Sequence, residues 1–458
     1  QGSGKSYSMA LLTRKIMRSI PGDWKFVIVT DRLDLDEQIY KNFAGVGAVT
    51  EPESEVRAES KEQLQQLLGE NHRYIFTLIH KFHSRDGEEF PVISEDDNII
   101  VITDEAHRTQ YDTLAMNMRK ALPNAAFLGF TGTPLIKGED QKTREVFGDY
   151  VSVYDFKQSI EDNATVPLYY ENRIPELELS NEHLNEELQQ LLDDAMLNEE
   201  QEKKLEREFK QEYHLITRKE RLETIAKDLV QHFLNRGFMG KGMMICIDRF
   251  TTVRMYDLVQ KEWKAEEERL KKQIQSAGAH ETDELLERLN FMKETDMAVV
   301  ISKSQNEIKE FDEEGLDIRE HRKRLEKESL DDKFKDDDDP LRLVFVCAMW
   351  ITGFSVSSLS TLYLDKPMKS HTLMQTIARA NRVFVDKNNG MIVDYVGVFR
   401  HLQKALATYA TGKDNKEGDE DPPVKNKAEL IEQLKAAIQK AKKYCNEQGV
   451  DLDKIINA

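Results

Sequence analysis

The sequence lacks any hydrophobic run long enough to cross a membrane. Its 458 residues contain no apolar stretch longer than residues 343–351, whereas a membrane-spanning helix needs about 20 consecutive apolar residues. A transmembrane protein is therefore excluded. At roughly 100 to 200 residues per domain, the length predicts two to four compact domains, each with its own core.

Cysteine is scarce. Cys246, Cys347 and Cys445 are the only three, and they lie far apart in the sequence. They show no metal-ligand spacing, and the first two lie within apolar, strand-like runs, so we interpret them as core residues in a reducing compartment. No charged and apolar signal segment opens the sequence, and the predicted location is therefore cytoplasmic.

An excess of positive charge is also missing. Lys and Arg number 65 against 84 Asp and Glu, for a net charge of −19 at pH 7. This excludes a basic coat over the whole chain for nucleic-acid binding, although a local basic groove stays open. Segments 171–213, 307–339 and 413–421 account for the acidic excess. We interpret them as solvated helix faces and exposed loops, with acidic interaction surfaces as the alternative.

The first six residues, Gln1-Gly-Ser-Gly-Lys-Ser6, match the second half of the phosphate-binding pattern G-x-x-x-x-G-K-[ST]. The first glycine of the pattern would lie upstream, so we expect the sequence to be part of a longer chain. Gly2, Ser3 and Gly4 would let backbone N–H groups close on phosphates at the start of a helix predicted for residues 7–20. Lys5 would contact the β- and γ-phosphates and Ser6 would bind Mg²⁺. A chance Gly-Lys-Ser turn is the alternative.

Four short apolar runs follow, at residues 26–29, 75–79, 99–102 and 126–130. Their alternation with helical or polar stretches predicts a parallel sheet with crossover helices. Asp104 and Glu105 come just past the third run, at the strand end where open α/β sheets bind ligands. Asp104 suits a direct or second-sphere Mg²⁺ ligand, and Glu105 suits the base that deprotonates the attacking water. The hydroxyls of Thr131 and Thr133 follow the fourth run and could sense the nucleotide; an ordinary turn is the alternative.

A second alternating region predicts another sheet, with strands at residues 243–247, 298–301, 343–346, 361–364 and 391–393 and a charged helical stretch at 251–289. On a helix through residues 375–382, Gln375, Arg379 and Arg382 would share one face, because positions i, i+4 and i+7 fall within about 60° of arc. Such cations fit arginine fingers, which contribute roughly 10³ to 10⁵ in rate to phosphoryl transfer. A solvated helix face is the alternative.

These motifs together carry a family resemblance. Gly2-Ser-Gly-Lys-Ser6, Asp104-Glu-Ala-His107, Thr131-Gly-Thr-Pro134 and Gln375-Thr-Ile-Ala-Arg-Ala-Asn-Arg382 resemble motifs I, II, III and VI of superfamily 2 helicases. More narrowly, most of residues 1–400 resembles the R (restriction and motor) subunit of type I restriction enzymes. The narrower match lies in residues 30–38, 104–108, 129–134, 351–354, 362–368, 371–375 and 390–397.

The resemblance implies an α/β fold of two RecA-like parallel-sheet domains with helical insertions and a C-terminal helical segment. ATP and Mg²⁺ would lie between the phosphate-binding loop and the two arginines of the second domain, Gln375 would contact the γ-phosphate or the attacking water, and duplex DNA would lie across both domains. Thr352 and Gly353 correspond to motif V, which links nucleotide and DNA contacts. Arg32 corresponds to motif Ia and Lys81 to the next DNA-side motif; for these two, an ordinary surface cation is the alternative.

We expect motor domain 1 at residues 1–165, an acidic helical connector at 166–238, motor domain 2 with charged helical insertions at 239–410, and a linker with the start of a C-terminal helical region at 411–458. The last region contains a stripe of Leu430, Leu434, Ile438, Ala441 and Cys445, which is typical of a core. The resemblance offers another reading, in which this helix begins the region that docks onto the methyltransferase.

The sequence departs from the family at two points. Residues 355–358, Ser-Val-Ser-Ser, replace the usual Asp and Pro of motif V, which puts a coupling role of that Asp in doubt. The family's nuclease domain would precede Gln1, so these residues would not encode DNA cleavage.

The predicted function is that of an ATP-hydrolysing double-stranded DNA translocase, the motor of a type I restriction-modification endonuclease that works with methyltransferase (modification) and specificity subunits. Another superfamily 2 DNA or RNA helicase or repair translocase is the alternative. A scaffold that binds ATP without hydrolysis is a third possibility, and the joint presence of Lys5, Asp104, Glu105 and both arginines argues against it.

Overall fold

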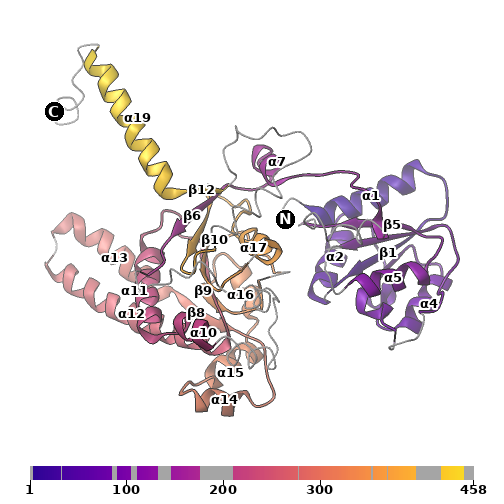
Figure 1. The fold of residues 1–458 in the computed structure, drawn as a ribbon, viewed down its shortest axis with the longest axis horizontal. Coiled ribbons are helices and arrows are strands. Elements are labelled where there is room, and N and C mark those ends of the chain that lie inside the picture. Colours follow the sequence, from indigo (N-terminus) through magenta and orange to yellow (C-terminus); the bar gives the residue numbers. More distant parts are fainter. Residues whose placement is uncertain are drawn as a thin grey trace. The chain divides into compact units, whose positions relative to one another are not determined.

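A computed structural model describes residues 4–31, 33–84, 90–104, 111–132, 146–175, 210–276, 278–351, 354–368, 370–398 and 424–447. The chain forms two compact units, Gln1–Asp155 and Phe156–Ala458, which are described separately (Figure 1). The division falls after Asp155, whereas the sequence placed the end of the first domain at residue 165. Among the described residues, no helix has the length and apolar character that a membrane span requires.

The first unit contains a five-stranded sheet in the order β2-β3-β1-β4-β5, and its paired strands are all parallel. The strands are β1 (Lys25–Thr30), β2 (Arg57–Ala58), β3 (Tyr74–Leu78), β4 (Ile99–Asp104) and β5 (Ala126–Phe130). The helices are α1 (Lys5–Ser19), α2 (Leu33–Gly45), α3 (Glu53–Val56), α4 (Lys61–Gly69), η1 (Ile79–Phe82) and α5 (Tyr111–Ala121). All four predicted strands are confirmed, except that Ile79 begins a 3₁₀ helix.

Alternate side chains of β1 enter two different cores, which explains why the strand is apolar throughout. Phe26 and Ile28 pack with Met9 of α1 and Phe43 of α2. Val27 and Val29 pack in a separate cluster that includes residues of α4 and α5. The sheet therefore has helices on both faces, the layered arrangement expected for a parallel α/β domain.

The second unit contains a seven-stranded sheet in the order β12-β6-β11-β10-β7-β9-β8, again with parallel pairing throughout. The strands are β6 (Leu168–Asn172), β7 (Lys241–Cys246), β8 (Asp296–Val300), β9 (Leu341–Val346), β10 (Leu359–Asp365), β11 (Gly390–Asp394) and β12 (Val424–Asn426). Among its helices are α7 (Phe156–Glu161), α10 (Lys210–Ile216), α11 (Lys219–Asn235), α12 (Arg249–Ser276), α13 (Ala279–Glu294), α14 (Glu307–Glu313), α15 (Arg319–Lys327), α16 (Leu330–Lys335), α17 (Ser370–Ile377) and α19 (Lys427–Glu447). The five strands predicted here are confirmed, as is the charged helical stretch, now α12 and α13. Two parallel sheets with helices confirm the predicted α/β fold class.

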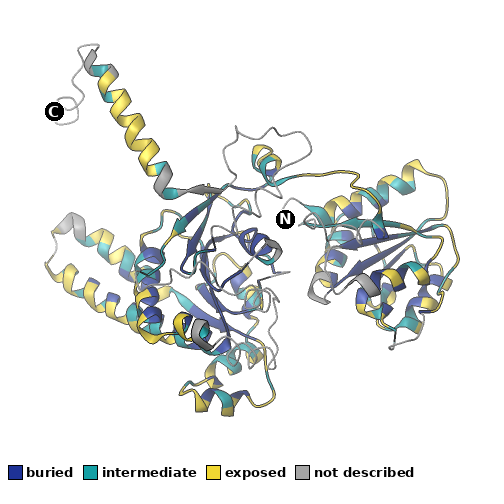
Figure 2. Cartoon of the chain, in the orientation of Figure 1, coloured by how far each residue is buried: buried dark blue, intermediate teal, exposed yellow. Residues whose placement is uncertain are grey.

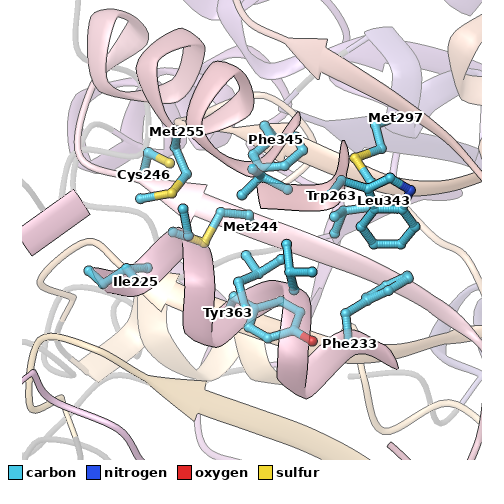
Figure 3. Close-up of a cluster of buried hydrophobic side chains, with 14 of the residues drawn as sticks. Ile225, Phe233, Met244, Cys246, Met255, Trp263, Met297, Leu343, Phe345 and Tyr363 are labelled. Carbon is cyan, nitrogen blue, oxygen red and sulfur yellow. The ribbon is translucent and has the colours of Figure 1, made fainter. Parts of the chain in front are cut away.

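One face of this sheet packs against α11 and α12. Figure 3 shows Phe233 of α11 and Trp263 of α12 beside Leu343, Phe345 and Tyr363 from the strands. Cys246 belongs to the same cluster with no exposed surface, and Cys347 is 5% exposed. The interpretation as core residues is confirmed for these two cysteines and wrong for Cys445, which is only half-buried.

Strand β6 lies inside the stretch for which the sequence suggested a helical connector. Its Glu171 also differs from a solvated acid, since the side chain is only 16% exposed and contacts Arg173 at 3.1 Å, His232 at 3.1 Å and Lys427 at 3.0 Å. Burial alone would raise the pKa of Glu171, but hydrogen bonds from these three side chains hold it well below its usual range. At this position the solvated-face interpretation is wrong.

The apolar stripe of α19 is not part of a core. Leu434 is 60% exposed and Ile438 is 48% exposed, and most of the helix is coloured as exposed in Figure 2. In the described part of the chain, α19 contacts β12 and β6. The core reading is therefore wrong, because the middle of the helix extends beyond the sheet edge to which its start is attached.

Candidate functional site

The structure brings together two predicted site residues that lie 99 positions apart in the sequence. Lys5 is the first residue of α1, and Asp104 is the last residue of β4. The Lys5 Nζ atom lies 2.9 Å from Asp104 Oδ1, and the two side chains are 20% and 9% exposed. The cation assigned to phosphate and the carboxylate assigned to Mg²⁺ thus form an ion pair at the carboxyl edge of the first sheet.

The start of α1 fits a phosphate group. Gly4 adopts a left-handed conformation, with φ of 85° and ψ of 25°, and a Cβ atom added there would have no atom within 4 Å. No side chain caps the helix, and its first turn holds no acid, so its first N–H groups suit an anion. Ser6 is half-buried in that first turn. A nucleotide with Mg²⁺ requires donors for its phosphates and oxygen ligands for the metal. The Lys5 ammonium and the uncapped start of α1 fit the first need, and the Ser6 hydroxyl and the Asp104 carboxylate fit the second.

Thr131 follows β5 next to the Lys5–Asp104 pair in the sheet. Asp104 is the register partner of Phe130, so the half-buried Thr131 is one residue beyond the strand end that neighbours Asp104. Lys81, on the short helix η1, is half-buried between buried Ile79 and Phe82. The remaining predicted site residues lie outside the described residues: Gly2, Ser3, Arg32, Glu105, Thr133, Thr352 and Gly353.

The predicted helical face of the second unit does not form. Helix α17 ends at Ile377, residues 378–381 form turns, and Arg382 makes an isolated antiparallel bridge with Thr165. Beyond the end of the helix, Asn381 O accepts a 2.7 Å hydrogen bond from Val166 N. Only Gln375, which is 3% exposed, lies on the helix. The expectation that Gln375, Arg379 and Arg382 share a helical face is wrong.

The two arginines have different surroundings. Arg379 is 8% exposed, and its guanidinium donates hydrogen bonds to Ile351 O at 3.2 Å and to Phe354 O. Arg382 is half-buried, and its Nε atom is buried without a hydrogen-bond partner among the described residues. Burial lowers the pKa of Arg382. It is therefore the arginine whose guanidinium most needs an anion.

Sequence reasoning missed Lys387. This lysine is 3% exposed, and its Nζ atom donates to Ser357 O at 3.0 Å and to Leu359 O at 2.7 Å. Burial, with a smaller contribution from the charge of Arg382, lowers its pKa to about 7. In the sequence it is a lysine in the polar run Asp-Lys-Asn-Asn, and nothing there distinguishes it from a solvated cation.

A pocket of about 690 Å³ opens beside Ser357. Lys335, Asp337, residues 355–357 and residues 383–385 line it. It therefore lies between the segment that replaces the usual motif V residues and the turn that carries Arg382. The part of the chain that the structure describes holds no cluster of three or more His, Cys, Asp or Glu side chains suited to a metal ion.

Comparisons with known proteins agree with this arrangement. Residues 1–205 match the family model of the SWI2/SNF2 ATPase, and residues 239–397 match that of type I restriction enzyme subunit R domain 3. The chain thus carries a SWI2/SNF2 ATPase domain and a type I restriction enzyme R-subunit domain. The first unit thus coincides with most of the ATPase match, and the β7–β11 part of the second sheet lies within the R-subunit match.

Two curated relatives are similar to this chain over nearly its full length. A protein of Methanocaldococcus jannaschii named for the type I restriction enzyme MjaIXP endonuclease subunit is 35% identical over 450 residues, which are 97% of this chain and 39% of the relative. The type I restriction enzyme HindI endonuclease subunit of Haemophilus influenzae is 37% identical, over 90% of this chain and 38% of the relative. The chain thus spans about two fifths of the length of these curated relatives.

A solved structure gives a weaker likeness. A fragment of an HsdR subunit of a type I restriction enzyme from Vibrio vulnificus is similar over 88% of this chain and 56% of that chain, with 16% sequence identity and a TM-score of 0.47.

Proposed function

We propose that the chain is the ATP-driven, double-stranded DNA translocase motor of a type I restriction-modification endonuclease. The observation that carries the proposal is the ion pair of Lys5 and Asp104 at the end of β4, 2.9 Å apart, in a chain with an ATPase match followed by an R-subunit match. The pair unites a phosphate-binding cation and a metal-binding carboxylate in the same place. These are two of the groups that ATP hydrolysis requires.

ATP, when bound, supplies the phosphoryl group whose transfer to water releases energy. In our proposal, Gly2, Ser3, Gly4 and Lys5 bind its phosphates, Ser6 and Asp104 bind Mg²⁺, and Glu105 orients and deprotonates water. Gln375 and Arg382 stabilise charge on the transferring group. Thr131, Thr133, Thr352 and Gly353 would link the nucleotide to DNA contacts, and Arg32 and Lys81 would bind DNA phosphates.

The net charge of −19 bears on how DNA is held. A chain that is acidic overall can bind duplex only through a local groove of cations and backbone N–H groups, and such contacts position DNA without reading its sequence. Sequence choice would then belong to a specificity subunit and modification to a methyltransferase subunit, both partners of this chain. We also propose that this protein works in the cytoplasm.

The test uses the full-length protein. Double-stranded DNA should stimulate its ATPase activity with little dependence on sequence, and DNA binding should weaken steeply as salt rises. In the assembled enzyme, a triplex-forming strand placed along the duplex should be displaced when ATP is present, while a strand-separation assay on the same duplex stays near background. Unwinding without triplex displacement, or stimulation by RNA instead of duplex DNA, would favour another superfamily 2 helicase and reject the proposal.

A further inference from the structure

The segment between β9 and β10 is fastened to the turn between α17 and β11 by two buried cations. The segment comprises residues 351–359, and the turn comprises residues 378–387. Arg379 and Lys387 extend from the turn and donate to backbone carbonyl groups of the segment. The segment includes the residues that correspond to motif V, and the turn includes Arg382.

Arg379 holds the first part of the segment. Its two acceptors, Ile351 O and Phe354 O, flank the Thr352–Gly353 position, so one planar guanidinium spans both ends of that loop. The Trp350 and Phe354 rings stack with their centroids 4.2 Å apart, which brings the two ends together. The contacts of Arg379 fit a residue that holds Ile351 and Phe354 in place better than one that reaches out to a phosphate.

Lys387 holds the last part. A buried ammonium must find acceptors for its protons, because an unpaired buried charge is very costly. Lys387 uses Ser357 O and Leu359 O, two carbonyls just before and at the start of β10. Carbonyl dipoles offset burial less well than a carboxylate would, which accords with the pKa of about 7.

The turn between these two attachments is unsatisfied. Asn381 has no exposed surface, and neither its Oδ1 nor its Nδ2 atom has a hydrogen-bond partner among the described residues. The Nε atom of Arg382 is in the same condition. Buried polar atoms without partners cost free energy that a ligand, a water or a rearrangement can recover. An anion that approaches Arg382 can therefore lower the free energy of this turn and favour a rearrangement of Asn381 and Arg382.

We infer that Arg379 and Lys387 are positioning residues that make the Arg382 turn and the 351–359 segment move as one body, so that nucleotide contact at Arg382 alters DNA contact at the segment. This inference rests on the proposed function and revises the predicted catalytic role of Arg379. The attachments are to backbone oxygens, so they do not depend on the segment's side chains. They offer a means of coupling in a chain that has Ser355–Ser358 where the family usually has Asp and Pro.

The test compares Lys387→Met with Lys241→Met in the full-length protein. Lys241 is a matched control, because it is also 3% exposed and its Nζ atom also donates to two backbone carbonyls, those of Lys333 and Asp336, which lie outside the segment. Lys387→Met should leave ATPase activity without DNA, and the KM for ATP, near the parental values. Stimulation by duplex DNA should fall by about fivefold or more. Lys241→Met should keep the stimulation, and Lys387→Arg, which retains donors for both carbonyls, should recover most of it.

Equal losses with and without DNA would overturn the inference, since they would make Lys387 a support of the fold alone. Parental DNA stimulation in Lys387→Met would also overturn it while leaving the proposed function intact. If the parental protein itself shows no DNA-stimulated turnover, the proposed function fails instead.

A second measurement does not depend on whether a variant folds. In the parental protein, a non-hydrolysable ATP analogue should change amide hydrogen exchange in residues 354–359, and exchange that is insensitive to the analogue would overturn the inference.

Discussion

The cations of the candidate site are held in opposite ways in the two units. In the first unit, Lys5 is neutralised by the Asp104 carboxylate at 2.9 Å. In the second, Arg379 and Lys387 donate to backbone carbonyls, and Arg382 has a buried Nε atom without a partner in the described residues. A carboxylate cancels a charge, whereas a carbonyl only solvates it, so the guanidinium groups of Arg379 and Arg382 keep their positive charge.

Because Lys5 and Arg382 are held differently, the free-energy cost of binding a phosphate should differ between them. A phosphate that binds Lys5 competes with a carboxylate already in place, and Mg²⁺ at Asp104 would remove that competition by engaging the carboxylate. A phosphate that approaches Arg382 meets a guanidinium whose pKa burial has lowered, so it relieves a desolvation cost. Under the proposed function, the first unit would select nucleotide together with metal, and the second would respond to the charge of the nucleotide.

Substitutions at Lys5 and Glu105 test the nucleotide site proposed for the first unit, and they should have the strongest effect on turnover. Lys5→Ala should abolish ATP turnover, with a loss of at least about 10² to 10³-fold, because it removes the cation that meets the developing phosphate charge. ATP binding should weaken as well. Glu105→Gln should instead keep ATP affinity while turnover falls. Turnover and equilibrium binding of ATP, measured on the full-length protein, separate the two variants. Hydrolysis at the parental rate in Glu105→Gln would show that Glu105 is not the base.

Substitution of Arg382 tests the role proposed for the turn of the second unit. Arg382→Ala should lower kcat by roughly 10³-fold and change ATP affinity little, because the contact strengthens as charge develops in the transition state. Arg382→Lys should rescue poorly, since an ammonium lacks the planar fork. Arg319→Ala is the control, because Arg319 is 50% exposed and paired with Asp312 on the surface. Near-parental turnover in Arg382→Ala would return this arginine to a structural role.

The sequence was informative wherever local pattern decides the structure. Strands buried on both faces read as continuous apolar runs, which is why β1, β4, β7 and β9 were predictable. Two short motifs assigned Lys5 to phosphate and Asp104 to Mg²⁺, and the strand-end rule placed Asp104 at the ligand-binding edge of the sheet. Their direct contact was not predicted.

Tertiary contacts decided the rest. Strand β6 has the mixed run Leu-Tyr-Tyr-Glu-Asn, and its Glu171 is accommodated only because Arg173, His232 and Lys427 converge on it. Beyond the end of α17, Asn381 O accepts a hydrogen bond from Val166 N, more than 200 residues earlier in the chain. Lys387 gives no local signal, since its acceptors are backbone atoms of another segment. Long-range partners of this kind leave no periodicity in a single sequence.

The pH dependence of the free energy of unfolding should report how well Lys387 is solvated by its carbonyl partners, and this effect should be smaller. The pKa of Lys387 is about 7, against an ordinary 10.5. Between these values the unfolded chain binds a proton that the folded chain does not, so the free energy of unfolding should rise with pH, by at most about 1.4 kcal/mol per pH unit. Lys387→Met should remove this part of the slope in urea unfolding from pH 7 to 9.5. Arg382→Ala should reduce it, because the charge of Arg382 helps to lower the pKa.

Val385→Ala supplies the control for that measurement. Val385 is 73% exposed in the same turn and should keep the parental pH slope. If Lys387→Met and Val385→Ala have the same slope, the buried lysine is charged throughout this range, and carbonyls solvate it as well as a carboxylate would.

The competition between Asp104 and a phosphate for Lys5 should have the smallest effect, and ATP binding by Asp104→Asn tests it. Without Mg²⁺, Asp104→Asn should tighten ATP binding by about two- to fivefold, the size expected from releasing a partly exposed ion pair. Removing a negative charge near the phosphates would tighten binding even without any pairing, so the measurement needs a double-mutant cycle. In a Lys5→Met background, Asp104→Asn should tighten binding less, and the difference between the two backgrounds is the contribution of the pair. With Mg²⁺ present, the sign should reverse, because the metal loses its carboxylate. Equal gains in ATP affinity in both backgrounds would mean that Asp104 repels the nucleotide without restraining Lys5. The ion pair of Lys5 would then no longer explain nucleotide selection in the first unit.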